Sequence, residues 1–125
     1  MSVLVDTSIW IDYFRGSTGV SKLDALIDEN IVVINDIILA ELIPFLKIKK
    51  QTKVIELLQE INQVPLQINW KEIIEYQVRC LKNGANGVGI TDLIIAQNAI
   101  SNNCKIYSFD KHFLLLSKVI NVDLF

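Results

Sequence analysis

The chain opens with a short apolar run from Ser2 to Val5 that stops abruptly at the polar triplet Asp-Thr-Ser. β-Branched residues without polar alternation predict a strand that is buried on both of its faces. Strands of this kind occur in parallel sheets whose two faces are covered by helices. The opening run therefore favours a fold in which helices cover a parallel sheet.

The rest of the chain alternates in the way that such a fold requires. Further strands are predicted at 31–34, 66–68 and 104–107, with a last edge strand at 119–122. Helical patterns are predicted at 9–14, 20–30, 37–42, 52–61, 70–81 and 91–100. Because strand–helix–strand crossovers are right-handed, this order predicts a three-layer α/β/α sandwich with a mostly parallel central sheet.

Capping residues predict where several of these elements begin. Ser8 is expected to be the N-cap of the first helix, and Asp110 is expected to cap a short turn late in the chain. Asn69, with Glu72 three residues later, resembles a capping box at the start of a helix. Three of the five glycines lie in the segment 83–89, which predicts a loop with residues at positive φ.

The clearest helical pattern on the chain is the one that begins at Trp70. Its positions at i, i+3, i+4, i+7, i+8 and i+11 are Trp70, Ile73, Ile74, Gln77, Val78 and Leu81. The helix whose body is 37–42 is expected to run until Pro44, which removes a backbone donor and disturbs or bends it.

Size, composition and charge limit the function classes. A chain of 125 residues has the size of one domain, and 51% hydrophobic against 21% charged residues is a globular composition. No apolar run approaches the roughly 18 residues that a bilayer crossing needs, and no basic segment precedes the opening strand, so a cytoplasmic protein without a membrane segment is expected. A formal net charge of −2 argues against a protein that coats nucleic acid by bulk charge.

The two cysteines offer no recognisable site. Cys80 and Cys104 are far apart in the sequence and do not form a C-x-x-C motif. Neither a zinc site nor a disulfide framework is therefore indicated, and both residues are expected to be buried thiols.

Four acidic residues are expected to meet at one edge of the sheet. Asp6 directly follows the first strand, and Asp110 lies three residues after the strand at 104–107. Asp92 lies in the first turn of the helix after the glycine-rich loop, and Glu41 lies inside the helix that follows the second strand. In parallel sheets, functional residues collect beyond the carboxyl ends of the strands.

Each of the three aspartates also has an ordinary explanation. Asp6, Asp92 and Asp110 lie where helices begin, and carboxylates are favoured there as caps and by the helix dipole. Glu41 is different, because it interrupts an apolar stretch and is expected to be partly buried. A buried carboxylate needs a partner. Like charges about 4 Å apart repel by roughly 4 kcal/mol at an effective dielectric of about 20, so a divalent cation would stabilise the group.

The oxygen-rich set indicates the kind of metal and the kind of chemistry. Mg²⁺ and Mn²⁺ prefer oxygen ligands and retain several waters, which suits Asp and Glu side chains. Such a site supports hydrolysis of a phosphodiester without a protein nucleophile. Thr7, Ser8 and Thr91 supply hydroxyls that are suited to orienting the carboxylates. The lysine-rich run at 47–53 and the pair at 111–112 are candidates for holding a polyanion, although such runs are more often solvated surface.

Four motifs in this order resemble those of PIN-domain ribonucleases, in particular the VapC-type toxins of bacterial and archaeal toxin–antitoxin pairs. They are V-L-V-D-T-S-I-W-I-D-Y-F-R-G around Asp6, I-L-A-E-L around Glu41, G-I-T-D-L-I-I-A around Asp92 and S-F-D-K-H-F around Asp110. The resemblance spans nearly the whole chain, residues 1–125, as one domain.

The resemblance implies an α/β/α sandwich with Mg²⁺- or Mn²⁺-dependent endoribonuclease activity. It implies that Asp6, Glu41, Asp92 and Asp110 are the catalytic, metal-binding quartet. Ser8 or Thr7 is then the polar residue beside the first aspartate. Proteins of this kind cleave RNA, pair with a cognate antitoxin whose tail fills the active-site groove, and form homodimers.

Two alternatives remain from the residues. A phosphoryl-accepting receiver domain also gathers acids at the edge of a parallel sheet. It requires adjacent acids after the first strand, however, where this chain has one Asp followed by Thr-Ser. A catalytically silent module of the same fold, which binds RNA or protein, is the other alternative. A divalent cation should raise the melting temperature of a nuclease and leave that of such a module unchanged.

Overall fold

The computed structural model describes residues 1–16 and 20–125. In this part of the chain the strands form one four-stranded sheet in the order β3-β2-β1-β4, and every pairing is parallel. The strands are β1 (Ser2–Val5), β2 (Val32–Ile34), β3 (Asn62–Gln63) and β4 (Cys104–Tyr107). The doubly buried opening strand predicted such a parallel sheet, with its strands connected by helices.

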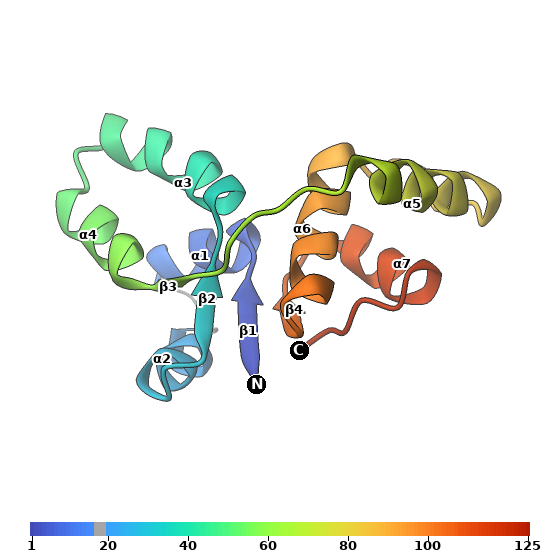
Figure 1. The fold of residues 1–125 in the computed structure, drawn as a ribbon. Helices are drawn as coiled ribbons and strands as arrows, with labels where there is room; N and C mark the ends of the chain where they lie inside the picture. Colours follow the sequence, from blue (N-terminus) through green and yellow to red (C-terminus); the bar gives the residue numbers. More distant parts are fainter. Residues whose placement is uncertain (17–19) are drawn as a thin grey trace.

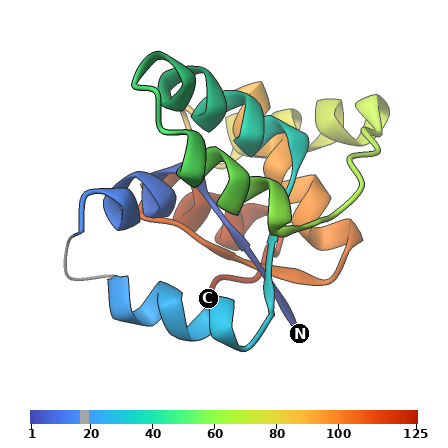
Figure 2. The ribbon, with the colours of Figure 1, turned by 90° about the vertical axis from the view of Figure 1, so that its left-hand side faces the viewer.

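Helices cover both faces of the sheet, so the expected three-layer sandwich is confirmed. In chain order the described helices are α1 (Thr7–Phe14), α2 (Val20–Asp28), α3 (Asp36–Ile48), α4 (Thr52–Glu60), α5 (Trp70–Lys82), α6 (Ile90–Ser101) and α7 (Lys111–Val119). Figure 1 shows α1 to α4 on one side of the strands and α5 to α7 on the other. From the first side, α2 and α4 lie in front of the strands (Figure 2).

Strand β1 is the centre of the molecule. It pairs with β2 on one side and β4 on the other, and Leu4 lies opposite Val33 and Ile106. Val3, Leu4 and Val5 are at most 1% exposed, which confirms that this strand is buried on both faces. The largest side chain beside it is Trp10, which is fully buried and donates its indole N–H to the carbonyl of Val5 at 3.1 Å. This bond satisfies the one polar atom of the ring.

The third strand lies earlier than predicted. Residues 62–63 pair with β2, whereas the predicted strand at 66–68 has no ladder partner among the described residues. The pattern was misleading because Leu66 and Ile68 are half-buried and Gln67 is exposed, an alternation that mimics a strand. Pro65 cannot donate to a ladder, and after it the chain crosses to the opposite face of the sheet (Figure 1).

The predicted edge strand at 119–122 is also wrong. Asp110 caps a nine-residue helix, α7, that occupies the chain as far as Val119. Asn121 then takes a positive φ of 60°, and only Leu124 forms a parallel bridge, to Ile106 of β4. The apolar residues at 119–122 therefore pack as a helix end and a turn rather than as a strand.

Pro44 does not end α3, which continues for four residues to Ile48. The helix at 70–81 is confirmed as α5, and its Asn69 cap accepts the backbone N–H of Glu72 at 3.1 Å. Part of its apolar pattern lies in solvent, however. Trp70 is 57% exposed, Ile74 63%, Val78 39% and Leu81 64%. We call these four residues the α5 stripe.

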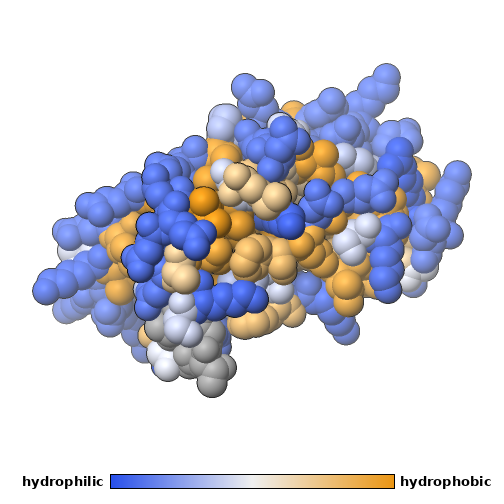
Figure 3. Space-filling view, turned by 90° about the horizontal axis from the view of Figure 1, so that it is seen from below, coloured by the Kyte–Doolittle hydropathy of each residue, from blue (hydrophilic) through white to orange (hydrophobic). Residues whose placement is uncertain are grey.

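Other expectations concern the loop, the thiols and the membrane. Gly84 and Gly87 adopt φ of 69° and 84°, as predicted for the glycine-rich loop, and Cys80 and Cys104 are buried free thiols. Among the described residues, no helix combines the length and apolar character required to cross a bilayer. At the end where the strands begin, hydrophilic residues surround a band of hydrophobic ones (Figure 3). Apolar atoms make up about 55–60% of ordinary protein surfaces, so a band of this kind is not unusual.

Candidate active site

The carboxyl ends of β1 and β4 form the edge at which the predicted site residues gather. Strands β2 and β3 lie on one side of β1 and β4 lies on the other, so the chain reverses direction across the sheet at β1. Such a switch point is where parallel α/β sheets bind ligands. The backbone N–H of Asp6 bonds to the carbonyl of Tyr107 at 2.9 Å, which brings the residues after both strands together.

Asp6 is held by a dense set of hydrogen bonds. It is only 7% exposed, and its Oδ2 accepts the Ser108 hydroxyl at 2.7 Å, the Ser8 hydroxyl at 3.0 Å and the Ser8 N–H at 3.5 Å. Asp6, and not Ser8, is therefore the N-cap of α1. The prediction for Ser8 was wrong by two residues because the carboxylate before it already accepts the orphan N–H group.

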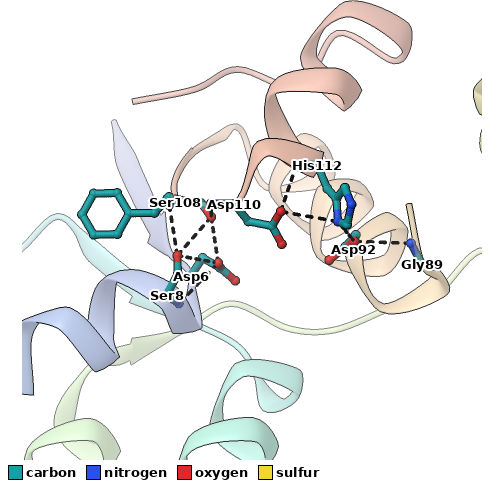
Figure 4. Close-up of polar contacts among 8 residues, drawn as sticks. Asp6, Ser8, Gly89, Asp92, Ser108, Asp110 and His112 are labelled. Atoms are coloured by element: carbon teal, nitrogen blue, oxygen red, sulfur yellow. Dashed lines mark hydrogen bonds and ion pairs between the residues drawn. The ribbon is translucent and has the colours of Figure 1, made fainter. Parts of the chain in front are cut away.

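Two serines connect the ends of β1 and β4 (Figure 4). The Ser8 hydroxyl accepts the N–H of Phe109 at 3.0 Å, and the Ser108 hydroxyl accepts the N–H of Asp110 at 2.9 Å. Their oxygens lie 3.3 Å apart. Ser108 is not among the predicted site residues, although it follows β4 directly, just as Asp6 follows β1. That equivalent position was the available signal.

Asp92 and Asp110 face each other across His112. Asp110 caps α7 by accepting the N–H of His112 at 2.9 Å, and Asp92 accepts the N–H of Gly89 at 3.3 Å. Nδ1 of His112 lies 3.2 Å from Oδ2 of Asp92 and 3.4 Å from Oδ1 of Asp110. In the described part of the chain, these three residues form the one group whose ligand atoms lie within 4.8 Å of one another. The sequence indicated His112 only as a polyanion contact.

Glu41 approaches the same edge from α3. Its Oε1 accepts the Thr7 hydroxyl at 3.1 Å. The expected partial burial is wrong for the residue as a whole, which is exposed at the rim. Desolvation of the carboxyl nevertheless raises its pKa, and the Thr7 hydrogen bond opposes this effect. The charges of Asp6 and Asp92 raise the pKa of Glu41 further.

The pKa of Asp92 is raised in a similar way. Burial is the largest cause, and the hydrogen bond from Gly89 opposes it. The negative charges of Asp110 and Asp6 raise the pKa further, whereas His112 lowers it. Since Glu41 and Asp92 both respond to their acidic neighbours, Asp6, Glu41, Asp92 and Asp110 belong to one electrostatic environment.

The donor set fits a divalent cation. Asp92, Asp110 and His112 bring two carboxylates and one imidazole within 4.8 Å of one another, whereas Asp6 and Glu41 do not belong to that group. In the ion pairs found among the described residues only His112 faces these acids. Burial is the largest cause of the raised pKa of Glu41 and of Asp92, and the acidic neighbours raise both further; a bound cation would oppose both effects by stabilising the ionised carboxylates. Of the three predicted hydroxyls, those of Thr7 and Ser8 bond to the acids. Thr91 is exposed, and no such bond is found for it in the described residues.

An apolar groove of about 540 Å³ borders this edge between α1, α3 and α4. Its walls include Ile11, Phe14 and Phe45, and Glu41 belongs to the lining. Arg15 and Lys49 are its basic residues. The groove therefore places apolar surface and two cations directly beside the acidic edge.

Several solved structures share this fold. VapBC2 from Rickettsia felis, bound to a DNA fragment from its promoter, matches with a TM-score of 0.79 and 21% identity over 100% of this chain and 98% of that chain. DNA-bound VapBC from Salmonella typhimurium matches with a TM-score of 0.78 and 15% identity over 100% and 97%. FitAcB from Neisseria gonorrhoeae matches with a TM-score of 0.73 and 21% identity over 98% and 96%.

No curated protein sequence matches the chain. The family model of the PIN domain, in contrast, matches residues 3–119, which is most of the chain. The motifs around the four acids, the parallel sheet and the acidic edge agree with that match. The chain therefore belongs to the PIN domain family.

Proposed function

We propose that this protein is a metal-dependent endoribonuclease that hydrolyses RNA phosphodiesters, with residues 1–125 as a single nuclease domain. We propose further that it acts in the cytoplasm as the VapC-type toxin of a toxin–antitoxin pair. The observation that carries the proposal is the geometry of the acidic edge at the switch point of the sheet. There the ligand atoms of Asp92, Asp110 and His112 lie within 4.8 Å of one another, and the Ser108 hydroxyl bonds to both Asp6 and the backbone of Asp110. Membership of the PIN domain family argues against the alternative of a phosphoryl-accepting receiver domain.

In this proposal, Asp6, Glu41, Asp92 and Asp110 hold the divalent ion, Mg²⁺ or Mn²⁺. When bound, such an ion neutralises charge on the phosphodiester and acidifies the attacking water. The protein contributes position: Ser8 and Ser108 fix the carboxylate of Asp6, and Thr7 orients Glu41. Thr91 is the third proposed hydroxyl of the site. No side chain is required to attack the phosphorus.

RNA is the proposed substrate, and the exposed lysines of the run at 47–53 support it. Lys47, Lys49, Lys50 and Lys53 are all exposed at the end of α3 and the start of α4. Lys49 also lines the groove that contains Glu41. A local group of cations lets a protein with a net charge of −2 hold a polyanion.

The proposed protein partner is an antitoxin that occupies the apolar groove. A partner segment with apolar side chains would cover Ile11, Phe14 and Phe45, and it would obstruct the edge at Glu41. The resemblance of the four motifs to those of VapC-type toxins, which pair with a cognate antitoxin, supports a partner of this class, and solved structures named VapBC share the fold. Phe45→Ser, which adds no charge beside Lys49, should weaken binding of the antitoxin while leaving RNA cleavage intact. Leu114→Ser, which changes an exposed apolar residue on α7, serves as the matched control.

A homodimer is proposed through the α5 stripe. Four apolar residues on one side of a helix are exposed to solvent, which is unfavourable unless a partner covers them. Size-exclusion chromatography with light scattering measures the mass of the protein in solution directly. Ile74→Glu should yield a monomer, whereas Lys71→Glu on the same helix should leave the dimer unchanged. A monomeric wild-type protein would refute this assembly.

The proposed activity is tested by sequencing the ends of cleaved RNA after incubation with the purified protein and Mg²⁺ or Mn²⁺. Discrete new ends that depend on the metal are expected, and Asp92→Asn should produce none. If the wild-type protein yields no new ends and neither ion raises its melting temperature, the protein is a silent binding module of the PIN fold.

A further inference from the structure

His112 lies at the centre of the acidic edge and is the single histidine of the chain. It lies in the first turn of α7, and its ring lies between Asp92 and Asp110 (Figure 4). The other side of the ring faces the glycine-rich loop, since a Cβ built on Gly87 would lie 3.6 Å from Nε2. The imidazole is thus positioned by a helix, by two carboxylates and by the loop.

The distances around Nδ1 suit a shared ion better than an ion pair. A charge-assisted hydrogen bond is about 2.7–2.9 Å long, and one N–H cannot point well at two acceptors. Nδ1 lies 3.2 Å and 3.4 Å from the two carboxylate oxygens, which is longer than such a bond on both sides. Neighbouring ligands of an octahedral ion with bonds of about 2.1 Å lie about 3 Å apart.

The donor atoms also determine which ion is preferred. Mg²⁺ prefers oxygen ligands, and an imidazole nitrogen adds little to its binding. Mn²⁺ does accept imidazole together with carboxylates, as in the di-manganese carboxylate proteins whose ligands are Glu and His side chains. A nitrogen donor among oxygens therefore shifts the preference of the site from Mg²⁺ toward Mn²⁺.

We propose that His112 is a metal ligand through Nδ1, so that Asp92, Asp110 and His112 form a nitrogen–oxygen subsite that binds Mn²⁺ in preference to Mg²⁺. The inference rests on the proposed function, because it names a ligand and a metal preference for that site. It adds a nitrogen donor to a ligand set that otherwise consists of oxygen.

The single histidine permits a direct spectroscopic test. Mn²⁺ is added to the full-length protein, prepared without a histidine tag, and pulsed electron paramagnetic resonance detects nitrogen bound to the ion. The wild-type protein should show ¹⁴N coupling, and the coupling should change to that of ¹⁵N when only histidine is labelled. Because the chain has one histidine, this coupling can arise only from His112.

Two variants separate ligation from positioning. His112→Asn keeps a hydrogen-bond donor near the two carboxylates but has no imidazole, and Lys118→Gln is the control on the exposed side of α7. His112→Asn should lose the nitrogen coupling and weaken Mn²⁺ binding by roughly 10-fold or more. Its Mg²⁺ affinity, measured by calorimetry, should change much less. Circular dichroism and the melting temperature establish that the variant is folded.

The outcomes distinguish this inference from the proposed function. If Mn²⁺ binds to the wild-type protein without nitrogen coupling, His112 is not a ligand, and the metal-dependent nuclease still stands. Equal losses of Mn²⁺ and Mg²⁺ affinity in His112→Asn would overturn the metal preference. If neither ion binds the wild-type protein at all, both the inference and the proposed function are refuted.

Discussion

The two sides of the acidic edge are built differently. Asp6 is buried, caps α1 and accepts hydrogen bonds from Ser8 and Ser108. Glu41 and Asp92 receive fewer donors, and burial together with their acidic neighbours raises the pKa of both. The protein itself satisfies Asp6, whereas the other side carries charge that it leaves uncompensated. The first arrangement favours folding, and the second favours a cationic ligand.

The largest expected effect is on the rate of RNA cleavage, and it should be the same for both sides. If both hold the ion, Asp6→Asn and Asp92→Asn should each slow RNA cleavage by roughly 100-fold or more, because several kcal/mol of transition-state stabilisation is lost. Initial rates on a defined RNA measure this. A variant that cleaves at the wild-type rate would remove its residue from the mechanism and leave only its structural role.

Addition of metal should reveal the uncompensated side. Mg²⁺ or Mn²⁺ at 100 times its Kd should stabilise the wild-type protein by about 2.7 kcal/mol, and a chelator should reverse the effect. The same ion should stabilise Asp92→Asn much less. Thermal unfolding at several metal concentrations measures the difference. An equal response in both proteins would place the ion away from Asp92.

Without metal, substitutions on the two sides should affect the free energy of unfolding differently. Asp6→Ala leaves two serine hydroxyls and a helix cap without their acceptor, so it should lower the free energy of unfolding by about 2 kcal/mol. Asp92→Asn relieves repulsion and should leave that energy unchanged or raise it. Urea denaturation in the presence of a chelator measures both variants. If Asp92→Asn destabilises the protein as much as Asp6→Ala, the contrast fails.

The smallest effect is a dependence of stability on pH. A carboxyl whose pKa is raised by folding contributes stability below its unfolded pKa, and this contribution is lost as the pH rises through the folded value. Metal-free Asp92→Asn should therefore be more stable than the wild-type protein at neutral pH. The difference should shrink as the pH falls toward 3.8, the ordinary pKa of Asp92. A melting-temperature difference that widens on acidification would contradict this sign.

Much of the fold follows from local patterns. The apolar runs that became β1, β2 and β4 are buried, and the residues after them lie at one edge, so the positions of Asp6 and Asp110 could be predicted. The third strand could not, because it has only two residues and an apolar alternation at 66–68 imitates it. Short strands carry too little pattern to compete with such a segment.

The hydrogen bonds and ion pairs within the site could not be predicted from the sequence. Ser8 and Ser108 are separated by 100 positions, and nothing local to either residue indicates that their hydroxyls lie 3.3 Å apart. His112 was noted for its charge, yet its position between Asp92 and Asp110 depends on how α6 and α7 pack. Hydrogen-bond partners of this kind are determined by tertiary structure.

Helix α5 gives a related lesson about periodicity. Its apolar spacing predicted the helix correctly, and Ile73 and Cys80 are buried as members of the core. The α5 stripe follows the same spacing but lies in solvent. Periodicity therefore identifies an apolar face without identifying what covers it.

The central position of β1 also affects synthesis on the ribosome. Asp6 follows β1, whereas Asp110 follows β4, the strand that pairs with β1, and is translated about a hundred residues after Asp6. A chain that has been synthesised only as far as α6 therefore lacks Ser108, Asp110 and His112 of the acidic edge. This topology gives a protein proposed to cut RNA a delay during which its own message is not exposed to the assembled site.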